Sequence, residues 1–431
     1  MEVPKPCIYR VPRQIRDVKP EAYTPRMVLI GPLHRSLKSF DIAKDGAETS
    51  SDPWDLKKDY LKMEDLKKKY LESYTKKVGE DTIEEMRKTI QAEEKNIRAS
   101  YEESTDWIKS EYFLDLILKD SVFIMEFITC HHENSEDDSD LDQSSYASVV
   151  TNDLILLENQ LPYFIFRSLF SSRISMMTQM TFDRYILSFF DISIGKKTDF
   201  KHFTDMLRRG YEESLFHNFQ ESLLRHIYRV TITGPGIVDL KSADNLSQAG
   251  VKFKARIMER FLYGDKDSIV KLSLRVEFEK GVLTMPGFHA SETSDMVLRN
   301  VIAFEQCHVA LTPYTSNYIH FLNFLIISDR DVQLLTEEGV VTNPMGRPSL
   351  VVDMVNKLQD GVNVGTSSQY FDVAEKLRAH YTSRRKRCWA TLKNVYFSDL
   401  WTGTATLAAV FLLLLTLIGT VASVIQAYKS F

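Results

Sequence analysis

An uncharged run near the C-terminus is the feature that most constrains how this chain can fold. Residues 403–425 contain no Asp, Glu, Lys or Arg, and they include the apolar sequence from Val410 to Leu415. A helix of this length extends about 34 Å at about 1.5 Å per residue, which is enough to cross a bilayer core about 30 Å thick. The sequence therefore predicts one transmembrane helix at 401–428, with Gly403–Ile425 in contact with the lipid bilayer.

Two other interpretations of this run fit the sequence less well. The first is a buried core helix, but an uncharged run of this length is unusual in a soluble domain. The second is the apolar tail of a glycolipid-anchor signal. Such a signal accompanies an N-terminal signal peptide, and Met1 to Pro6 contain no apolar segment of that kind.

Charges on either side of the run predict its orientation. The membrane-flanking basic cluster consists of Arg384, Arg385, Lys386 and Arg387. Lys393 also precedes the run, and only Lys429 follows it, so the positive-inside rule places the N-terminal body in the cytoplasm with a short exoplasmic tail. We expect this membrane to be the plasma membrane or the endoplasmic reticulum. A nuclear signal or an anionic-lipid patch are other interpretations of the cluster, but its position beside the run favours topology.

The rest of the chain has an ordinary globular composition. Of its 431 residues, 44% are hydrophobic and 26% are charged, which excludes a disordered or collagen-like chain. The net charge of −5 gives no indication of a nucleic-acid partner. The four cysteines are isolated from one another, so neither a disulfide framework nor a zinc site is predicted. We expect no metal and no cofactor.

Helical periodicity dominates residues 1–395. Apolar residues recur every three or four positions from Leu56 to Val78, and the opposite face is rich in Lys and Glu. Further helices are expected near 83–101, 111–130, 151–170, 293–307, 316–326, 329–336, 349–358 and 370–392. Residues 1–40 are Pro-rich and irregular. No long linker or internal repeat divides the region, so we predict a single, mainly α-helical body.

A small β element interrupts this pattern at about 251–288. Residues Val251 to Ala255 and Leu272 to Phe278 alternate between apolar and polar side chains. A turn at Glu279 to Gly281 then leads to Val282 to Pro286. Period-two alternation on both sides of a short turn predicts a β-hairpin.

An acidic stretch at 133–142 resembles a cation site only superficially. Asp138 to Asp142 looks like the start of a calcium loop. Gln143, however, stands where the sharp turn of such a loop needs Gly, and Val149 stands where it needs a bidentate Glu. We therefore expect a solvated loop.

The most informative polar cluster consists of Glu158, Asn159, Gln160 and Pro162. Pro162 has no N–H to donate to the carbonyl of Glu158, so the helix expected at 151–170 should be kinked or broken there. The three polar side chains lie between apolar runs. They can satisfy the freed backbone groups, or they can contact a partner or ligand. We favour the structural role and expect the three side chains to be buried and hydrogen-bonded.

The sequence contains no phosphate loop, dinucleotide fingerprint, nucleophile elbow or His-Glu-x-x-His motif. Glu305 and His308 have the spacing of a di-iron ligand pair, but no second Glu-x-x-His occurs. Cys307 and His308 resemble a thiol nucleophile and its base, but adjacent helical residues point about 100° apart. The pair His131-His132 lacks a further ligand at a fixed spacing. We therefore expect a protein without enzymatic activity.

Several blocks in a fixed order carry a resemblance to a known family. They are Cys7 to Pro12, Pro20 to Pro25, Ile30 to His34, Asp153 to Pro162, Ala249 to Phe253, Gly281 to Leu283, Arg299 to Cys307 and Asp331-Val332. With the C-terminal run, these blocks resemble the plant proteins grouped as domain of unknown function 247, over nearly the whole chain. Pro6 departs from the family, which often has a second Cys beside the first. The resemblance implies a plant-specific, single-pass protein, and it implies no catalytic residues.

Three functions are consistent with these observations. The first is a membrane-anchored interaction or signalling protein whose body binds an unidentified protein partner. The second is a pollen-side determinant of self-incompatibility, a role that the resemblance implies because some grass members of the family are implicated in it. The third is an enzyme with an unrecognised site. A deep pocket with converging His, Cys and carboxylate groups would favour the enzyme, and an apolar groove with a polar rim would favour binding.

Overall fold

The computed structural model describes residues 5–34, 56–133, 144–192, 194, 199–216, 234–256, 273–308, 311–383 and 400–429. Over these ranges the chain is mainly helical with a few short strands, which confirms the predicted fold class. Nearly all of the acidic stretch lies outside the described residues, as does the membrane-flanking basic cluster at 384–387.

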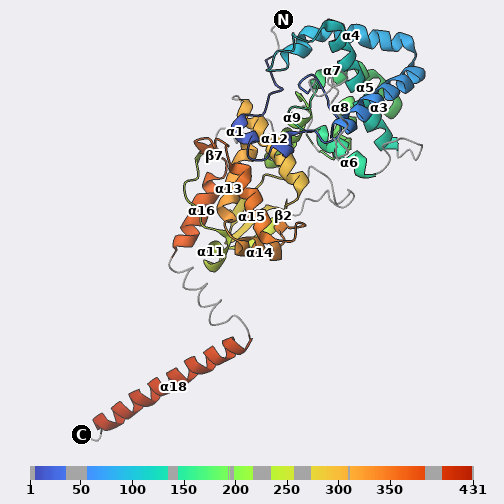
Figure 1. Ribbon diagram of the computed structural model, residues 1–431. Helices are drawn as coiled ribbons and strands as arrows, with labels where there is room; N and C mark the ends of the chain where they lie inside the picture. Colours follow the sequence, from blue (N-terminus) through green and yellow to red (C-terminus); the bar gives the residue numbers. More distant parts are fainter. Residues whose placement is uncertain are drawn as a thin grey trace.

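One group of helices forms the upper part of the body in Figure 1. Its members are α3 (Leu56–Val78), α4 (Glu80–Ala99), α5 (Ser110–Glu133), α6 (Ser144–Asp153), α7 (Tyr163–Thr178) and α8 (Phe182–Phe189). Helices α3, α4 and α5 pack against one another, α7 contacts α4 and α8, and α8 contacts α5. Their apolar stripes face inward, as their periodicity predicts.

A second group of helices forms the lower part. Its members are α11 (Ala243–Gln248), α12 (Glu292–Cys307), α13 (Tyr314–Leu325), α14 (Asp329–Glu337), α15 (Pro348–Gln359) and α16 (Phe371–Thr382). Helix α15 contacts α12, α13 and α14, and α11 contacts α14. Helix α9 (Phe203–Phe216) contacts both α12 and α13.

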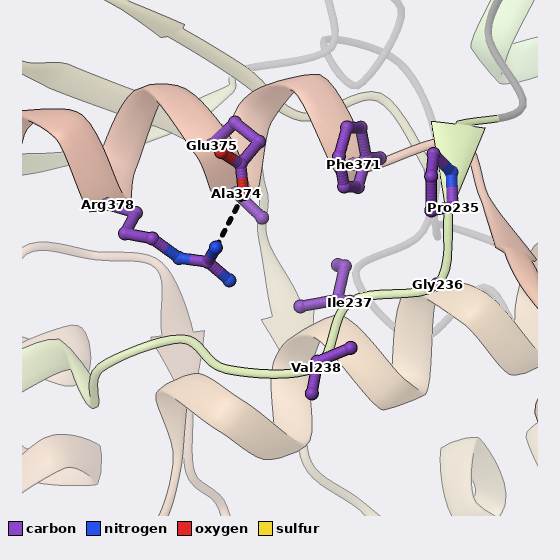
Figure 2. A pocket seen from close by; sticks show the side chains of 8 residues that line it. All are labelled: Pro235, Gly236, Ile237, Val238, Phe371, Ala374, Glu375 and Arg378. Atoms are coloured by element: carbon purple, nitrogen blue, oxygen red, sulfur yellow. Dashed lines mark ion pairs between the residues drawn. The ribbon is translucent and has the colours of Figure 1, made fainter.

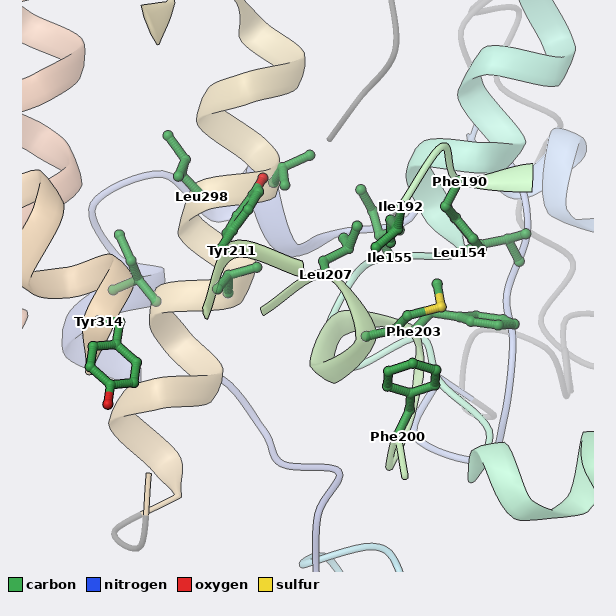
Figure 3. Close-up of a cluster of buried hydrophobic side chains, with 14 of the residues drawn as sticks. Leu154, Ile155, Phe190, Ile192, Phe200, Phe203, Leu207, Tyr211, Leu298 and Tyr314 are labelled. Carbon is green, nitrogen blue, oxygen red and sulfur yellow. The ribbon is translucent and has the colours of Figure 1, made fainter. Parts of the chain in front are cut away.

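The buried apolar cluster around α9 joins the two groups. Figure 3 shows Phe203, Leu207 and Tyr211 of α9 between Leu154 and Ile155 on one side and Leu298 of α12 on the other. These side chains belong to one continuous hydrophobic cluster that includes residues of both groups. Within the described residues, the two groups of helices therefore share one hydrophobic core.

The short strands form three separate sheets. Strands β2 (Lys252–Arg256), β3 (Glu277–Glu279) and β4 (Val282–Pro286) form a sheet in the order β2-β4-β3. The predicted hairpin is β3-β4, which is antiparallel, with its turn at Lys280-Gly281. The remaining pairs are antiparallel β1 (Gly234–Pro235) with β7 (Ser367–Ser368), and parallel β5 (Phe288–His289) with β6 (Val341–Thr342).

One detail of the predicted β element needs correction, and the structure adds one that was not predicted. The alternation at 272–278 predicts a strand, but 273–276 are not in a strand and β3 begins at Glu277. Strand β2 pairs with β4 in parallel. Alternation predicts which residues face inward, but it carries no information about the direction of the neighbouring strand.

The helix expected at 151–170 is broken. Helix α6 ends at Asp153, residues 154–162 form turns, and α7 begins at Tyr163. Pro162 precedes α7 in an extended conformation with φ −59° and ψ 129°. A proline in this position loses no helical hydrogen bond, because its missing N–H would have had no partner at a helix start.

Helix α18 (Leu400–Lys429) contains the uncharged run. It is long and apolar enough to cross a membrane, and the window Thr406–Ser423 has none of its residues buried. Large apolar side chains along the helix are more than half exposed, including Phe411, Leu413 and Ile418.

Candidate functional site

Glu158 connects the body to the N-terminal segment, which we define as residues 5–34. The carboxylate is only 3% exposed. One oxygen accepts a hydrogen bond from the Val11 N–H at 2.7 Å and forms an ion pair with the Arg16 guanidinium at 2.6 Å. The other accepts from the Arg10 guanidinium at 3.1 Å. A buried carboxylate requires paired charges and donors, and here the N-terminal segment supplies both.

Asn159 binds the same segment through its backbone. Its side-chain oxygen accepts the N–H of Ile30 at 2.7 Å. Its side-chain nitrogen donates to the carbonyls of Val28 and Asp153, both at 2.9 Å. The amide thus satisfies both a donor and an acceptor of an extended, buried stretch that includes Val28 and Ile30.

Asp153 makes a second set of contacts with the backbone of the N-terminal segment, at residues 26–28. Its carboxylate accepts N–H bonds from Arg26, Met27 and Val28 at 2.7 to 2.9 Å. Burial raises the pKa of Asp153 to about 6, and the three N–H groups oppose that increase by stabilising the charged form. All of these partners belong to the protein itself.

Gln160 closes the turn between α6 and α7. Its side-chain nitrogen donates to the carbonyls of Leu154 and Leu156 at 2.7 and 2.8 Å. Its side-chain oxygen accepts the N–H of Phe203, the first residue of α9, at 2.9 Å. The side chain therefore satisfies backbone groups that the break leaves without helical partners, as expected for the structural role.

Gly31 is required where the N-terminal segment crosses this turn. Its φ is +68°, a conformation that disfavours residues with a Cβ. A Cβ at this position would lie 2.5 Å from the backbone oxygen of Gln160. The Gly31 N–H donates to Asp120 of α5 at 2.8 Å. Close approach and backbone conformation both explain why a glycine occupies this position.

A fully buried lysine strengthens the attachment. Lys67 of α3 has no exposed surface, and its ammonium lies 2.7 Å from both Asp120 and Glu64. It also donates to the carbonyl of Leu29. Burial alone would lower the pKa of Lys67, but the two carboxylates raise it, so the ammonium stays charged.

Helix α12 fixes the turn and the N-terminal segment from the other side. Asn300 accepts the Leu157 N–H at 2.9 Å and donates to the carbonyl of Ala22 at 2.8 Å. Asp295, one turn earlier, binds Lys19 at 2.8 Å. The sequence analysis did not single out either residue as a site, although Asn300 lies in one of the blocks that carry the family resemblance.

His202 is a third residue of the site that has no signal in the sequence. It is fully buried just before α9, and its Nε2 lies 2.9 Å from the Cys7 carbonyl. Its Nδ1 accepts the N–H of Asp205 at 3.3 Å, so Nε2 carries the proton and donates to Cys7. Burial lowers the pKa of His202 to about 4. An isolated His without a spaced partner gives no signal in a sequence.

The residues Glu305, Cys307 and His308 do not form a catalytic arrangement. Glu305 accepts the N–H groups of Thr315 and Ser316, both at 2.9 Å, and so caps the first turn of α13. Cys307 lies 3.7 Å from the Arg10 carbonyl, and burial raises the pKa of its thiol to about 12. His308 directly follows the last residue of α12, and its ring packs against Tyr9 and Phe304.

Two further expectations concern metals. No group of three or more His, Cys, Asp or Glu side chains that could hold a metal ion occurs in the described part of the chain. His131 and His132 lie near the C-terminal end of α5. Both rings contact Phe189 of α8, and the His132 ring also contacts Tyr185. This pair packs on aromatic side chains.

A groove of about 340 Å³ lies beside α16 (Figure 2). Its lining residues are Pro235, Gly236, Ile237, Val238, Phe371, Ala374, Glu375 and Arg378. The polar side chains are at one edge, where Arg378 pairs with Glu375 at 2.9 Å and also donates to the Asp239 carbonyl. The lining contains no His or Cys. Its apolar floor and charged edge are typical of a binding surface.

Comparisons with known proteins identify a matching protein family. A family model, DUF247, described as a plant protein of unknown function, matches residues 8–415. UPF0481 protein At3g47200 of Arabidopsis thaliana is 24% identical over 448 residues, covering 97% of this chain and 86% of the relative. Putative UPF0481 protein At3g02645 of the same plant is 22% identical over 489 residues, covering 95% and 88%. No solved structure matches.

Proposed function

Because this chain belongs to the DUF247 family of plant proteins of unknown function, we propose from its own geometry that it is a membrane-anchored protein-interaction module. The observation that carries the proposal is α18, an apolar helix with exposed side chains beside a body that buries its own apolar residues efficiently. Such a helix is stable in water only if a bilayer or another apolar surface covers it.

The interaction role rests on the surfaces of the body. Glu158 and Asn159 are occupied by the N-terminal segment, and Gln160 is occupied by the first residue of α9. The groove beside α16 has an apolar floor of the kind that accepts side chains of a partner. The capping role of Glu305 and the raised pKa of Cys307 also support binding over catalysis.

The orientation is part of the proposal. The membrane-flanking basic cluster, with Lys393 before the run and only Lys429 after it, supports a cytoplasmic body by the positive-inside rule. In that position the body would present its binding surfaces to cytoplasmic proteins, at either the plasma membrane or the endoplasmic reticulum.

The anchor is tested by deleting residues 403–431. We expect the full chain to stay in the membrane pellet after a carbonate wash and the truncated chain to move to the soluble fraction. The matched control deletes only 426–431, which leaves the uncharged run intact and should remain membrane-bound. A truncated chain that stays in the carbonate-washed pellet would contradict the single anchor.

The interaction role is tested by proximity labelling from the anchored full chain. The control carries the same labelling enzyme on residues 384–431 alone, so it reaches the same membrane without the body. We expect proteins that are labelled by the full chain and not by the control. Identical labelled sets would contradict an interaction role for the body.

A further inference from the structure

Strand β2 forms one edge of the three-stranded sheet. The order of the described strands is β2-β4-β3, so β2 pairs with β4 along one of its sides. The Lys252 N–H donates to the Gly281 carbonyl and therefore points toward β4. Backbone groups of successive residues in a strand point to opposite sides, so those of Phe253 and Ala255 point away from β4. Among the described strands, none pairs with this outer side of β2.

The pleat of β2 separates a buried face from an exposed face. Phe253 is 3% exposed and belongs to the core, whereas Lys252 and Lys254 are exposed. The register places the two lysines beside Val282 and Thr284 of β4. Because every second side chain of a strand points to the same face, both lysines lie on the solvent face of the sheet. We call Lys252 and Lys254 the edge lysines.

Neither edge lysine forms an ion pair with any carboxylate of the described residues. Glu277 of β3 is the carboxylate of this face that pairs, with Arg256 at 2.5 Å and with Arg275. Glu279 also lies on β3, which β4 separates from β2. The open edge of the sheet therefore carries two positive charges that the protein itself does not neutralise locally.

These charges decide between two possible occupants of the open edge. Pairing of β2 with a second copy of itself would bring the edge lysines of both copies together, and like charges on paired strands are destabilising. Edge strands commonly use lysines to prevent such self-association. A foreign strand with carboxylates at alternate positions has the opposite effect, because it places opposite charges across the strand pair.

We propose that the outer side of β2 binds an extended segment of a partner protein with Asp or Glu at alternate positions, which adds to the sheet as a further strand. The backbone groups of Phe253 and Ala255 supply the hydrogen bonds of strand addition, and the edge lysines select the acidic side chains. This inference rests on the proposed interaction function and names the chemistry of the partner.

The test measures binding of a short synthetic peptide of alternating Thr and Glu residues to the full chain in nanodiscs of uncharged phosphatidylcholine. We expect the peptide to bind, with an affinity that falls as salt increases. A Thr–Lys peptide of the same length should not bind. The Thr–Glu peptide with every backbone nitrogen methylated keeps its charges but donates no N–H, so it should bind at least about tenfold more weakly.

The variant that tests the edge is Lys254→Glu. It places like charges together and should weaken binding of the Thr–Glu peptide at least about tenfold. The matched control is Lys58→Glu, the same change of charge at an exposed residue of α3, which should leave the affinity unchanged. Both variants should keep the thermal midpoint of the full chain, because both positions are exposed.

Three results would overturn the inference. The first is the absence of Thr–Glu binding to the unchanged chain. The second is equal affinity of Lys254→Glu and the unchanged chain, which would exclude selection by the edge lysines. The third is equal affinity of the methylated and unmethylated peptides, which would show attraction by charge without strand addition.

Failure of this inference is distinguishable from failure of the proposed function. Proximity labelling with Lys254→Glu should lose part of the body-dependent set of neighbours. If that set is unchanged, the protein still interacts with partners but the outer side of β2 does not bind them. If no body-dependent set exists even for the unchanged chain, the proposed function itself fails.

Discussion

The side-chain oxygen of Asn159 accepts a hydrogen bond from the backbone N–H of Ile30 at 2.7 Å, across 129 positions of the sequence. Through its nitrogen the same side chain donates to the Val28 carbonyl at 2.9 Å. A buried extended segment needs partners for its backbone groups, and sheets usually supply them. Here an amide and the Asp153 carboxylate do so, and they attach the N-terminal segment to the middle of the chain.

Replacing Asn159 by Leu should therefore destabilise the protein. The substitution leaves the Ile30 N–H and the Val28 and Asp153 carbonyls buried without this partner. Each loss of that kind costs about 1–3 kcal/mol, so we expect at least that decrease in the free energy of unfolding. Urea unfolding of the full chain in detergent, followed by far-ultraviolet circular dichroism, measures it.

The control for this experiment is Asn356→Leu in α15. Asn356 is exposed, and its side chain accepts a bond from Asn323. We expect a change within about 0.5 kcal/mol, as for most surface substitutions. An Asn159→Leu protein as stable as the control would show that the amide is dispensable and would reopen a ligand role for the cluster.

The helices were predictable because their signal is local. The apolar spacing in α3, α4 and α5 repeats within each helix, and no distant residue is needed to detect it. The break at Pro162 was also predictable, since the missing N–H is a property of that residue. The partners of Glu158 and Asn159 were not predictable, because Val11 and Ile30 contribute only backbone groups and lie far away in sequence.

Other parts of the site have no sequence signal at all. His202 has no spaced companion, and its role depends on the carbonyl of Cys7, 195 positions away. Glu305 and His308 have the spacing of a di-iron ligand pair, yet Glu305 caps α13 through backbone N–H groups.

The buried His202 contributes stability that is lost in acid. Burial lowers its pKa to about 4 in the native state, whereas an unfolded His titrates near 6.5. Between these values the unfolded chain binds a proton that the native chain does not, so this contribution of about 3 kcal/mol is lost as pH drops from about 6.5 to about 4. Asp153 contributes in the opposite direction, because its raised pKa of about 6 lets the native chain bind a proton first. The difference in urea midpoints between His202→Gln and the unchanged chain at pH 7.5, 5.5 and 4.5 therefore measures the His202 contribution.

His202→Gln isolates that contribution. Glutamine keeps a side-chain N–H for the Cys7 carbonyl but does not titrate, so its loss of stability between pH 6.5 and 4.5 should be smaller. The matched control is His131→Gln, the same substitution at an exposed ring near the end of α5. If His202→Gln and the unchanged chain lose the same stability in acid, His202 is not the responsible group.

The last prediction concerns topology. Asn245-Leu246-Ser247 is the only Asn-x-Ser/Thr acceptor sequence in the chain. Asn245 is exposed in α11, and its side-chain nitrogen donates to the hydroxyl of Ser242 at 3.1 Å. A cytoplasmic body never meets the glycosylation machinery, so we expect Asn245 to be unmodified. Glycosidase treatment of the protein from plant membranes should then leave its mass unchanged, and Asn245→Gln should migrate identically. Protease digestion of sealed vesicles provides the independent measurement, because a cytoplasmic body is degraded while a lumenal one is protected. A glycosidase-sensitive mass that disappears in Asn245→Gln, together with protection of the body, would reverse the orientation and place the body on the exoplasmic side.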